Sequence, residues 1–223
     1  MAKMKRKQQD DKILEFYYQF QEYYKEHKNR VWTIITIILI AAVVVFIYFK
    51  NVSEKQETAT LELSKVKPVY MSGAYDQAIT GDTLGMSRGL LYIVNEYGST
   101  ESGETAKILL ANCYYYLRDF DNAEKYYKDY GGNNEIYQVT SIAGVGAVME
   151  ARGDYKGAAE QFEKAAGYSK SIANNDEYLF YAMRNFFMAN DTESLKRVVD
   201  ELKSEYPKSK YVQQAGRYDF DIE

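Results

Sequence analysis

The hydrophobic positions along the chain follow two different patterns. Residues 31–49 form one apolar run, VWTIITIILIAAVVVFIYF, without a charged residue. In residues 73–208, apolar residues instead recur at helix-like intervals among charged ones, a pattern typical of amphipathic helices. Only two prolines interrupt the chain, and Ala, Glu, Lys and Leu are abundant, which favours helix throughout. The pattern predicts an all-α protein.

The apolar run has the length of a membrane span. Its 19 residues make a helix about 28 Å long at about 1.5 Å per residue, close to the hydrocarbon thickness of a bilayer. Val31 and Trp32 stand at one end and Tyr48 and Phe49 at the other, with the aromatic residues at interfacial positions. No other segment is comparably apolar, so a core helix of this kind would lack partners. Residues 31–49 are therefore predicted to be a transmembrane helix.

The flanking residues favour an uncleaved anchor with a defined orientation. The run is longer than a typical signal-peptide core, 30 residues precede it, and residues 50–54 (KNVSE) offer no small-x-small cleavage site. Lys25, Lys28 and Arg30 flank one end closely, whereas only Lys50 and Lys55 lie near the other. The positive-inside rule then places residues 1–30 in the cytoplasm and the larger part across the membrane. In a bacterium this means a single-pass inner-membrane protein with a periplasmic domain.

The segment before the span predicts an amphipathic helix with an aromatic stripe. Its apolar residues have the spacing of one helix face: Ile13, Leu14, Phe16, Tyr17, Phe20, Tyr23 and Tyr24. Two interpretations stay open. The helix lies at the headgroup level or simply continues the anchor, or the stripe binds a partner protein.

The larger part of the chain repeats itself. The stretch DYKGA, starting at Asp154, aligns with DFDNA, starting 35 residues earlier at Asp119. A third copy, YDQA, begins at Tyr75. Self-similarity near 34 residues is typical of helical repeat arrays, and the spacing of small and large residues fits the tetratricopeptide pattern. The sequence therefore predicts an α-solenoid of tetratricopeptide repeats.

The repeat pattern also predicts which residues pack. Small residues allow the two helices of a unit to approach closely, and large ones fill the gap between units. In the two clearest units these residues are Ala111, Tyr114, Ala123 and Tyr127, then Gly146, Ala158 and Phe162. A looser third unit contains Leu179, Ala182, Met183, Phe186, Leu195, Val199 and Pro207. Asn174–Glu177 and Asn190–Glu193 have the spacing of capping boxes.

These patterns give a domain organisation. Residues 1–30 are the cytoplasmic segment, 31–49 the span, 50–72 a membrane-proximal helix or stalk, and 73–223 the repeat domain. Its units are expected at about 73–100, 104–137, 139–172 and 176–208. The first is irregular because ITGDTLGMSRG, after Ala78, is rich in turn-forming residues. Residues 53–70 supply its first helix or act as a stalk.

Composition argues against several classes of function. Residues 50–223 carry 20 Lys/Arg against 27 Asp/Glu, a net charge of −7, which does not suit a nucleic-acid backbone. Cys113, the only cysteine, lies among apolar residues, as a buried structural thiol does. His27 is the only histidine, so there is no His to pair with a nucleophile and no His/Cys metal cluster. Gly144-Val145-Gly146 lacks the third glycine of a dinucleotide loop. We expect no enzyme, no cofactor, no metal and no small-molecule substrate.

The chain resembles YfgM-like membrane-anchored tetratricopeptide proteins, which are ancillary subunits of the bacterial Sec translocon. The resemblance extends over the architecture and is most specific in residues 73–166, which include GLLYIVNEYGST and AKILLANCYYYLRDFDNAEKYYKD. It implies a non-catalytic scaffold beside the SecYEG channel, with a PpiD-like chaperone and translocating polypeptides as partners. An assembly scaffold for another envelope complex, in division or cytochrome maturation, is the alternative.

A partner would bind the concave face, which the first helix of each unit lines in tetratricopeptide arrays. The candidate residues are Ile108, Asn112, Tyr115, Tyr116, Thr140 and Ala143. Ile108 and Ala143 occupy positions where carboxylate clamps place polar or basic groups, so an aromatic and apolar groove is expected instead. In the other interpretation, Tyr115 and Tyr116 only cover neighbouring helices.

Overall fold

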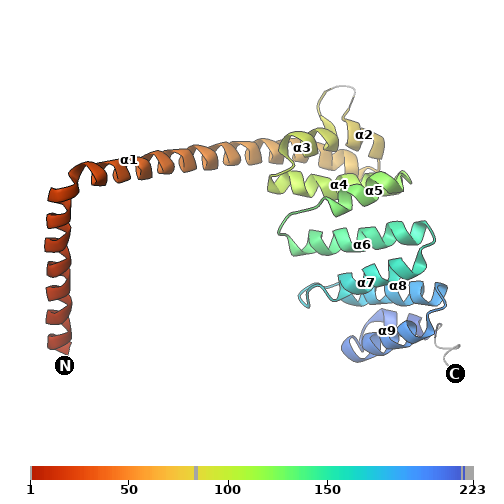
Figure 1. The fold of residues 1–223 in the computed structure, drawn as a ribbon. Coiled ribbons are helices and arrows are strands. Elements are labelled where there is room, and N and C mark those ends of the chain that lie inside the picture. Colours follow the sequence, from red (N-terminus) through yellow and green to blue (C-terminus); the bar gives the residue numbers. More distant parts are fainter. Residues whose placement is uncertain (1, 83–84, 217, 219–223) are drawn as a thin grey trace. The chain divides into compact units, whose positions relative to one another are not determined.

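The computed structural model describes residues 2–82, 85–216 and 218, and its regular elements there are all helices, with 80% of the chain helical and no strand in the described part. Side chains are described from Leu14 onward, except those of residues 16, 20, 83–84, 217 and 219–223. The chain divides into two compact units, Met1–Glu54 and Lys55–Glu223. The first α-helix, α1 (Ala2–Met71), begins in one unit and ends in the other (Figure 1).

The first unit is helical, and the side chains of its apolar stretch are largely exposed. Trp32, Ile38, Tyr48 and Phe49 are all more than half exposed, and Val31 is partly buried. The segment is long and apolar enough to cross a membrane, and none of its most apolar window is buried. Trp32 Nε1 donates a hydrogen bond to the Tyr24 hydroxyl at 3.2 Å. Such apolar surface needs a nonaqueous environment, which agrees with the predicted span.

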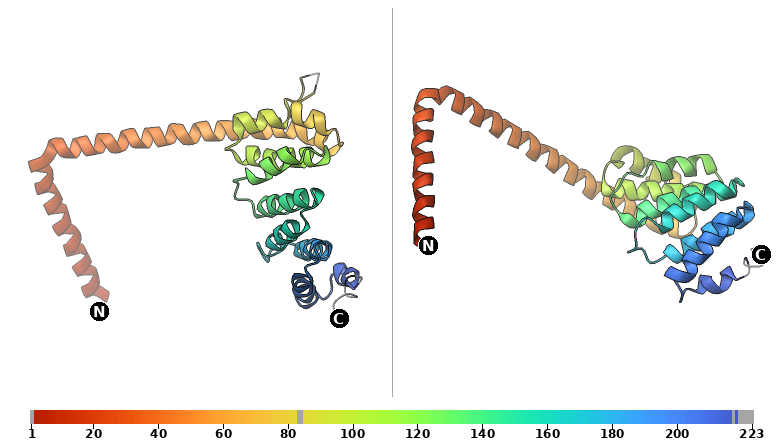
Figure 2. Two further views of the ribbon diagram at one scale, coloured as in Figure 1. Left: turned by 45° about the vertical axis from the view of Figure 1, so that its right-hand side comes forward. Right: turned by 60° about the horizontal axis from the view of Figure 1, so that its bottom comes forward.

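The second unit is built from short helices that pack mainly against their neighbours in the chain (Figure 1, Figure 2). After the end of α1 come α2 (Tyr75–Thr80), α3 (Gly89–Tyr97), α4 (Glu101–Tyr116), α5 (Phe120–Lys128), α6 (Glu135–Ala151), α7 (Tyr155–Ala166), α8 (Asn175–Met188), α9 (Thr192–Glu205) and α10 (Lys210–Ala215). The predicted loop after Ile79 includes residues 83 and 84, which lie outside the described residues.

Three helices of this unit begin in the same way. Asp119, Asp154 and Asp191 precede α5, α7 and α9, and each side chain accepts a hydrogen bond from a backbone N–H in the first turn. This satisfies one of the free donors at a helix start. Of the two predicted caps, Asn174 does occupy the N-cap position of α8 but without the predicted side-chain bond, and the one at Asn190 was wrong. Asn174 makes no side-chain capping bond, and Asn190 has a left-handed backbone (φ 56°) one residue before the true cap.

The end of α1 belongs to the packed unit rather than to a free stalk. Leu63 and Val66 are buried in a cluster with residues of α2–α6. Thr60 and Gln56 each hydrogen-bond the Ser102 hydroxyl, at 2.8 and 3.1 Å. Of the two roles left open for residues 53–70, these contacts favour a helix packed within the second unit over a free stalk.

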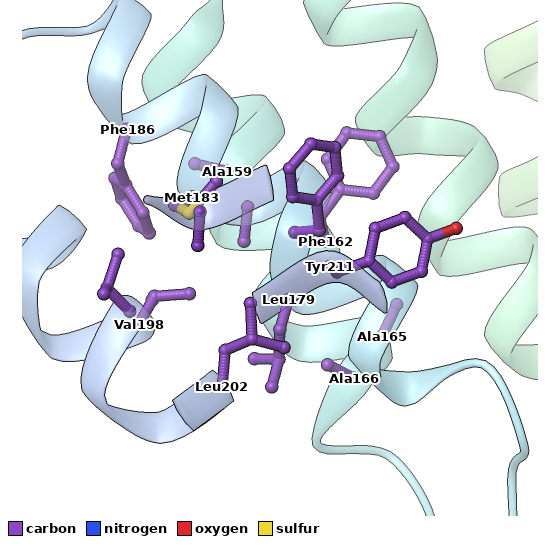
Figure 3. Close-up of a cluster of buried hydrophobic side chains, with 14 of the residues drawn as sticks. Ala159, Phe162, Ala165, Ala166, Leu179, Met183, Phe186, Val198, Leu202 and Tyr211 are labelled. Carbon is purple, nitrogen blue, oxygen red and sulfur yellow. The ribbon is translucent and has the colours of Figure 1, made fainter. Parts of the chain in front are cut away.

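A second cluster joins α6 to α10 around the alanines of α7. Ala158, Ala159, Ala165 and Ala166 are all at most 7% exposed. Figure 3 shows three of these alanines beside large side chains of the following helices, including Leu179, Met183, Phe186, Val198 and Leu202. With one-carbon side chains on α7, its neighbours approach closely, and their larger side chains fill the space.

Candidate functional site

A groove of about 380 Å³ lies over α6, with walls from α4, α5, α7 and α8. Five of its residues belong to α6: Thr140, Ala143, Gly144, Ala147 and Glu150. The others are Tyr115 of α4, Tyr127 of α5, Phe162 of α7, and Tyr178, Tyr181 and Arg184 of α8. The small residues of α6 leave space between the aromatic side chains that line the groove from α4, α5, α7 and α8.

Gly144 explains how α5 comes so close to α6. A Cβ atom built on Gly144 would lie 2.4 Å from the Tyr127 ring, far inside contact distance. Tyr127 is 4% exposed, and its hydroxyl donates to Asn112 Oδ1 at 2.6 Å. Burial raises the pKa of the Tyr127 hydroxyl, so it stays protonated and remains a donor. The ring is held on both sides and requires glycine beneath it.

Asn112 is partly buried and makes two hydrogen bonds inside the fold. Its amide accepts from Tyr127, and its Nδ2 donates to the Tyr70 hydroxyl at 3.1 Å. This links α1, α4 and α5 beneath the groove. These bonds use its Oδ1 and one of the two N–H groups of its Nδ2.

One ion pair and a set of hydroxyl groups supply the polarity of the groove. Arg184 Nη2 lies 2.5 Å from Glu150 Oε1, and Asn185 Nδ2 donates to Glu150 Oε2 at 3.1 Å. The Arg184 guanidinium also lies over the Tyr181 ring, 5.3 Å from its centroid. Both groups remain partly exposed, with 38% of the Arg184 side chain and 28% of the Glu150 side chain accessible. The groove therefore holds one positive and one negative group that already neutralise each other.

The groove tyrosines are neutral at physiological pH. Burial, followed by its hydrogen bond to Glu177, raises the pKa of Tyr181 to about 12. Burial and then the nearby Glu150 raise the pKa of Tyr115. Neutral phenols combine a flat apolar face with a hydroxyl donor, which suits a mixed apolar and polar ligand.

The six predicted binding residues have three different fates. Tyr115, Thr140 and Ala143 line the groove. Asn112 lies beneath it, and Tyr116 lies beside it, 58% exposed and stacked on Tyr75 with ring centroids 4.7 Å apart. Ile108 cannot face a partner, because it is 1% exposed and belongs to the same buried cluster as Leu63 and Val66. The sequence pattern did not show that the end of α1 packs into this unit, and the prediction for Ile108 therefore missed its burial.

The predicted packing residues lie in the interior of the second unit. Ala111, Ala123 and Ala158 are fully buried, and Gly146 and Phe162 are buried too. Tyr114 is partly buried and stacks on Tyr126, with ring centroids 5.7 Å apart. Cys113 is also fully buried, and burial, then Asp76, raises the pKa of its thiol to about 12.

Sequence reasoning missed the α8 wall of the groove. Tyr178 stands 35 residues after Ala143, so the repeat spacing itself contained a signal for it. Tyr181 and Arg184 correspond to no predicted binding position. Gly144 was considered only as part of a dinucleotide loop, whereas its role is steric.

A second hollow, of about 520 Å³, lies at the starts of α4 and α6. It is lined by Glu101, Glu104 and the loop 130–134, among others. Glu104 is already engaged by Lys107 Nζ at 2.9 Å and by the Gly131 N–H at 2.8 Å. Among the residues with described side chains, no group of three or more His, Cys, Asp or Glu is placed to hold a metal.

Comparison with protein families, with curated proteins and with solved structures gave no match to this chain.

Proposed function

We propose that this protein is a membrane-anchored, non-catalytic scaffold whose repeat domain binds an extended polypeptide segment in the groove over α6. The observation that carries the proposal is the groove itself: an apolar floor of Ala143 and Ala147 between the rings of Tyr115, Tyr178 and Tyr181. Aromatic walls with hydroxyl groups are a common way to hold peptide side chains and backbone together.

The repeat architecture supports the proposal. Helices that pack mainly on their chain neighbours, with aspartate caps at Asp119, Asp154 and Asp191, fit a tetratricopeptide solenoid. In such arrays the first helices of successive units line one binding face. Here α4, α6 and α8 are those helices, and each contributes to the groove.

The membrane anchor determines where the proposed scaffold is located in the cell. Residues 31–49 cross the inner membrane, the basic residues before Val31 stay in the cytoplasm, and the repeat domain lies in the periplasm. A peptide-binding domain held at the membrane surface suits proteins emerging from a channel. We therefore infer a YfgM-like accessory role at the SecYEG translocon, together with a PpiD-like chaperone and translocating polypeptides.

Purification of the full chain in mild detergent tests this role. SecY and a PpiD-like protein should copurify with the wild type. Ala147→Trp, which fills the groove, should reduce the yield of translocating polypeptides. Lys164→Trp is the matched control because Lys164 is exposed on α7 and does not line the groove. If Ala147→Trp copurifies with as much SecY and as many translocating polypeptides as the wild type, the groove is not the binding site. Absence of SecY under conditions that keep the channel intact would contradict the translocon assignment.

The predicted orientation is tested separately. Protease added to spheroplasts should degrade the chain after Lys50. Full protection of that region would overturn the periplasmic location of the repeat domain.

A further inference from the structure

The helix α1 breaks just before the predicted membrane span. His27 has φ −123° and ψ 32°, outside the helical range, and it lies four residues before Val31, where the apolar run begins. The His27 ring contacts Tyr23 edge-on, with centroids 4.7 Å apart. Kinks in long helices have identifiable local causes, and here the break separates a charged, aromatic segment from an apolar one.

The segment before the break has two unlike faces. At about 100° per residue, Tyr17 and Tyr24 lie within about 20° of each other around the helix, whereas Tyr23 lies about 100° from Tyr24. Glu15, Glu22 and Glu26 gather on the other side. Tyr17 is 55% exposed, so the described chain does not cover the aromatic face.

The environment next to this face is a bilayer. An unbroken helix would carry Tyr17 about 21 Å beyond Val31, away from the membrane. A break at His27 instead allows the segment to turn along the surface, where tyrosine and tryptophan are favoured. Trp32, at the start of the span, donates to the Tyr24 hydroxyl across the break and thus joins the aromatic face to the interfacial end of the span. Residues 1–30 carry eight Lys/Arg against five Asp/Glu, and this net positive charge suits an anionic leaflet.

We propose that the helix preceding His27 lies along the membrane surface, with Tyr17 and Tyr24 inserted at the headgroup level of an anionic bilayer. This inference rests on the membrane anchor of the proposed function. The apolar face of such a helix sits about 5–10 Å into the boundary between headgroups and acyl chains. The segment fixes the depth of the anchor and extends its contact with lipid beyond the span.

Spin labels on the full chain in nanodiscs of phosphatidylethanolamine and phosphatidylglycerol test the proposal. Single cysteines replace Tyr17, Tyr18, Glu22 or Ile38, and accessibility to oxygen is compared with accessibility to a water-soluble nickel chelate. Tyr18 is the matched control, because it is as exposed as Tyr17 (61% against 55%) but points about 100° away. Cys113 stays in place, since it is fully buried, and the unsubstituted chain measures any labelling of it.

We expect a several-fold higher ratio of oxygen to nickel accessibility at Tyr17→Cys than at Tyr18→Cys and Glu22→Cys, with Ile38→Cys deepest. Equal, water-like ratios at the first three positions would overturn the surface helix while leaving the anchor intact. So would a smooth increase towards the span without helical periodicity, or protection of Tyr17→Cys from both reagents, which would indicate a protein partner. A water-like ratio at Ile38→Cys would overturn the anchor itself.

Discussion

Two neighbouring helices, α6 and α7, are both rich in small residues and use them in opposite ways. The alanines of α7 are buried in one cluster with residues of α6, α8 and α9, and are at most 7% exposed. On α6, Ala143 and Ala147 instead form the floor of a groove between aromatic walls. The same residue type thus produces a close-packed crossing in one helix and a hollow in the next.

The difference lies in the neighbours. A small residue permits close approach only where another element comes to meet it, and Leu179 and Met183 do so against α7. Over α6 the adjacent side chains, Tyr115 and Tyr181, stand at the edges. Gly144 belongs to α6 but permits close packing, as the α7 alanines do, because the Tyr127 ring covers it. A run of small residues in the sequence therefore indicates either close helix packing or the floor of a groove, and only the three-dimensional structure distinguishes the two.

The largest expected effect contrasts enlarged alanines in the two helices. Ala158→Leu should lower the free energy of unfolding by about 1–3 kcal/mol, because the fully buried site has no room for three more carbons. Ala147→Leu should change it by less than about 0.5 kcal/mol, because the new side chain extends into the groove. Urea denaturation followed by circular dichroism measures both. Equal destabilisation would mean that the groove is not open space.

The next effect separates two glycines of α6. Alanine improves helix propensity by about 1 kcal/mol at either position. At Gly144 the clash with Tyr127 should exceed this gain, for a net loss of about 1 kcal/mol. Gly146→Ala is the control, because its nearest heavy atom, Gln161 Cβ, is 3.1 Å away, a much milder contact than the 2.4 Å between the Gly144 position and the Tyr127 ring. Its unfolding midpoint should stay close to that of the wild type, and a reversed order would contradict the role of Gly144.

A smaller effect concerns the start of α7. Asp154→Ala removes the acceptor for the Gly157 N–H and should cost about 1 kcal/mol. Glu160→Ala, at an exposed position of the same helix, should cost less than half as much. Thermal unfolding of the two variants side by side measures the difference. Equal midpoints would show that α7 depends on its packing alone.

The smallest effect depends on pH and on the tie between α7 and α9. The hydrogen bond from the Ser194 N–H, then Lys156 of α7, lowers the pKa of Asp191. A carboxyl with a lower pKa in the folded state stabilises the fold above its unfolded pKa of about 3.9, and this contribution is lost as the pH falls through the folded value. The stability difference between wild type and Asp191→Asn should therefore shrink on acidification below about pH 5. A difference that is constant down to pH 3 would contradict this.

The sequence was sufficient for the helical class, the apolar segment and the small residues at Ala111, Ala123 and Ala158, because each depends on a local period. Ile108 was wrongly predicted to face a partner, because it is buried in a cluster that includes Leu63 and Val66 from the end of α1. The α8 wall was missed because Tyr181 and Arg184 meet α6 only through the packing of α7 and α8. At the start of α9, Asn190 and Asp191 are both good capping residues, and only the backbone decides between them.

A photocrosslinking amino acid in place of Tyr115 tests the central claim most directly. Introduced into the full chain in cells that are actively secreting proteins, it should form adducts with polypeptides, and Ala147→Trp should abolish them. The same group at Tyr168, which is 42% exposed but outside the groove, is the control. Adducts that depend on position 115 and on an open groove are the predicted result. Adducts equally strong from position 168, or unchanged by Ala147→Trp, would contradict a peptide-binding groove over α6.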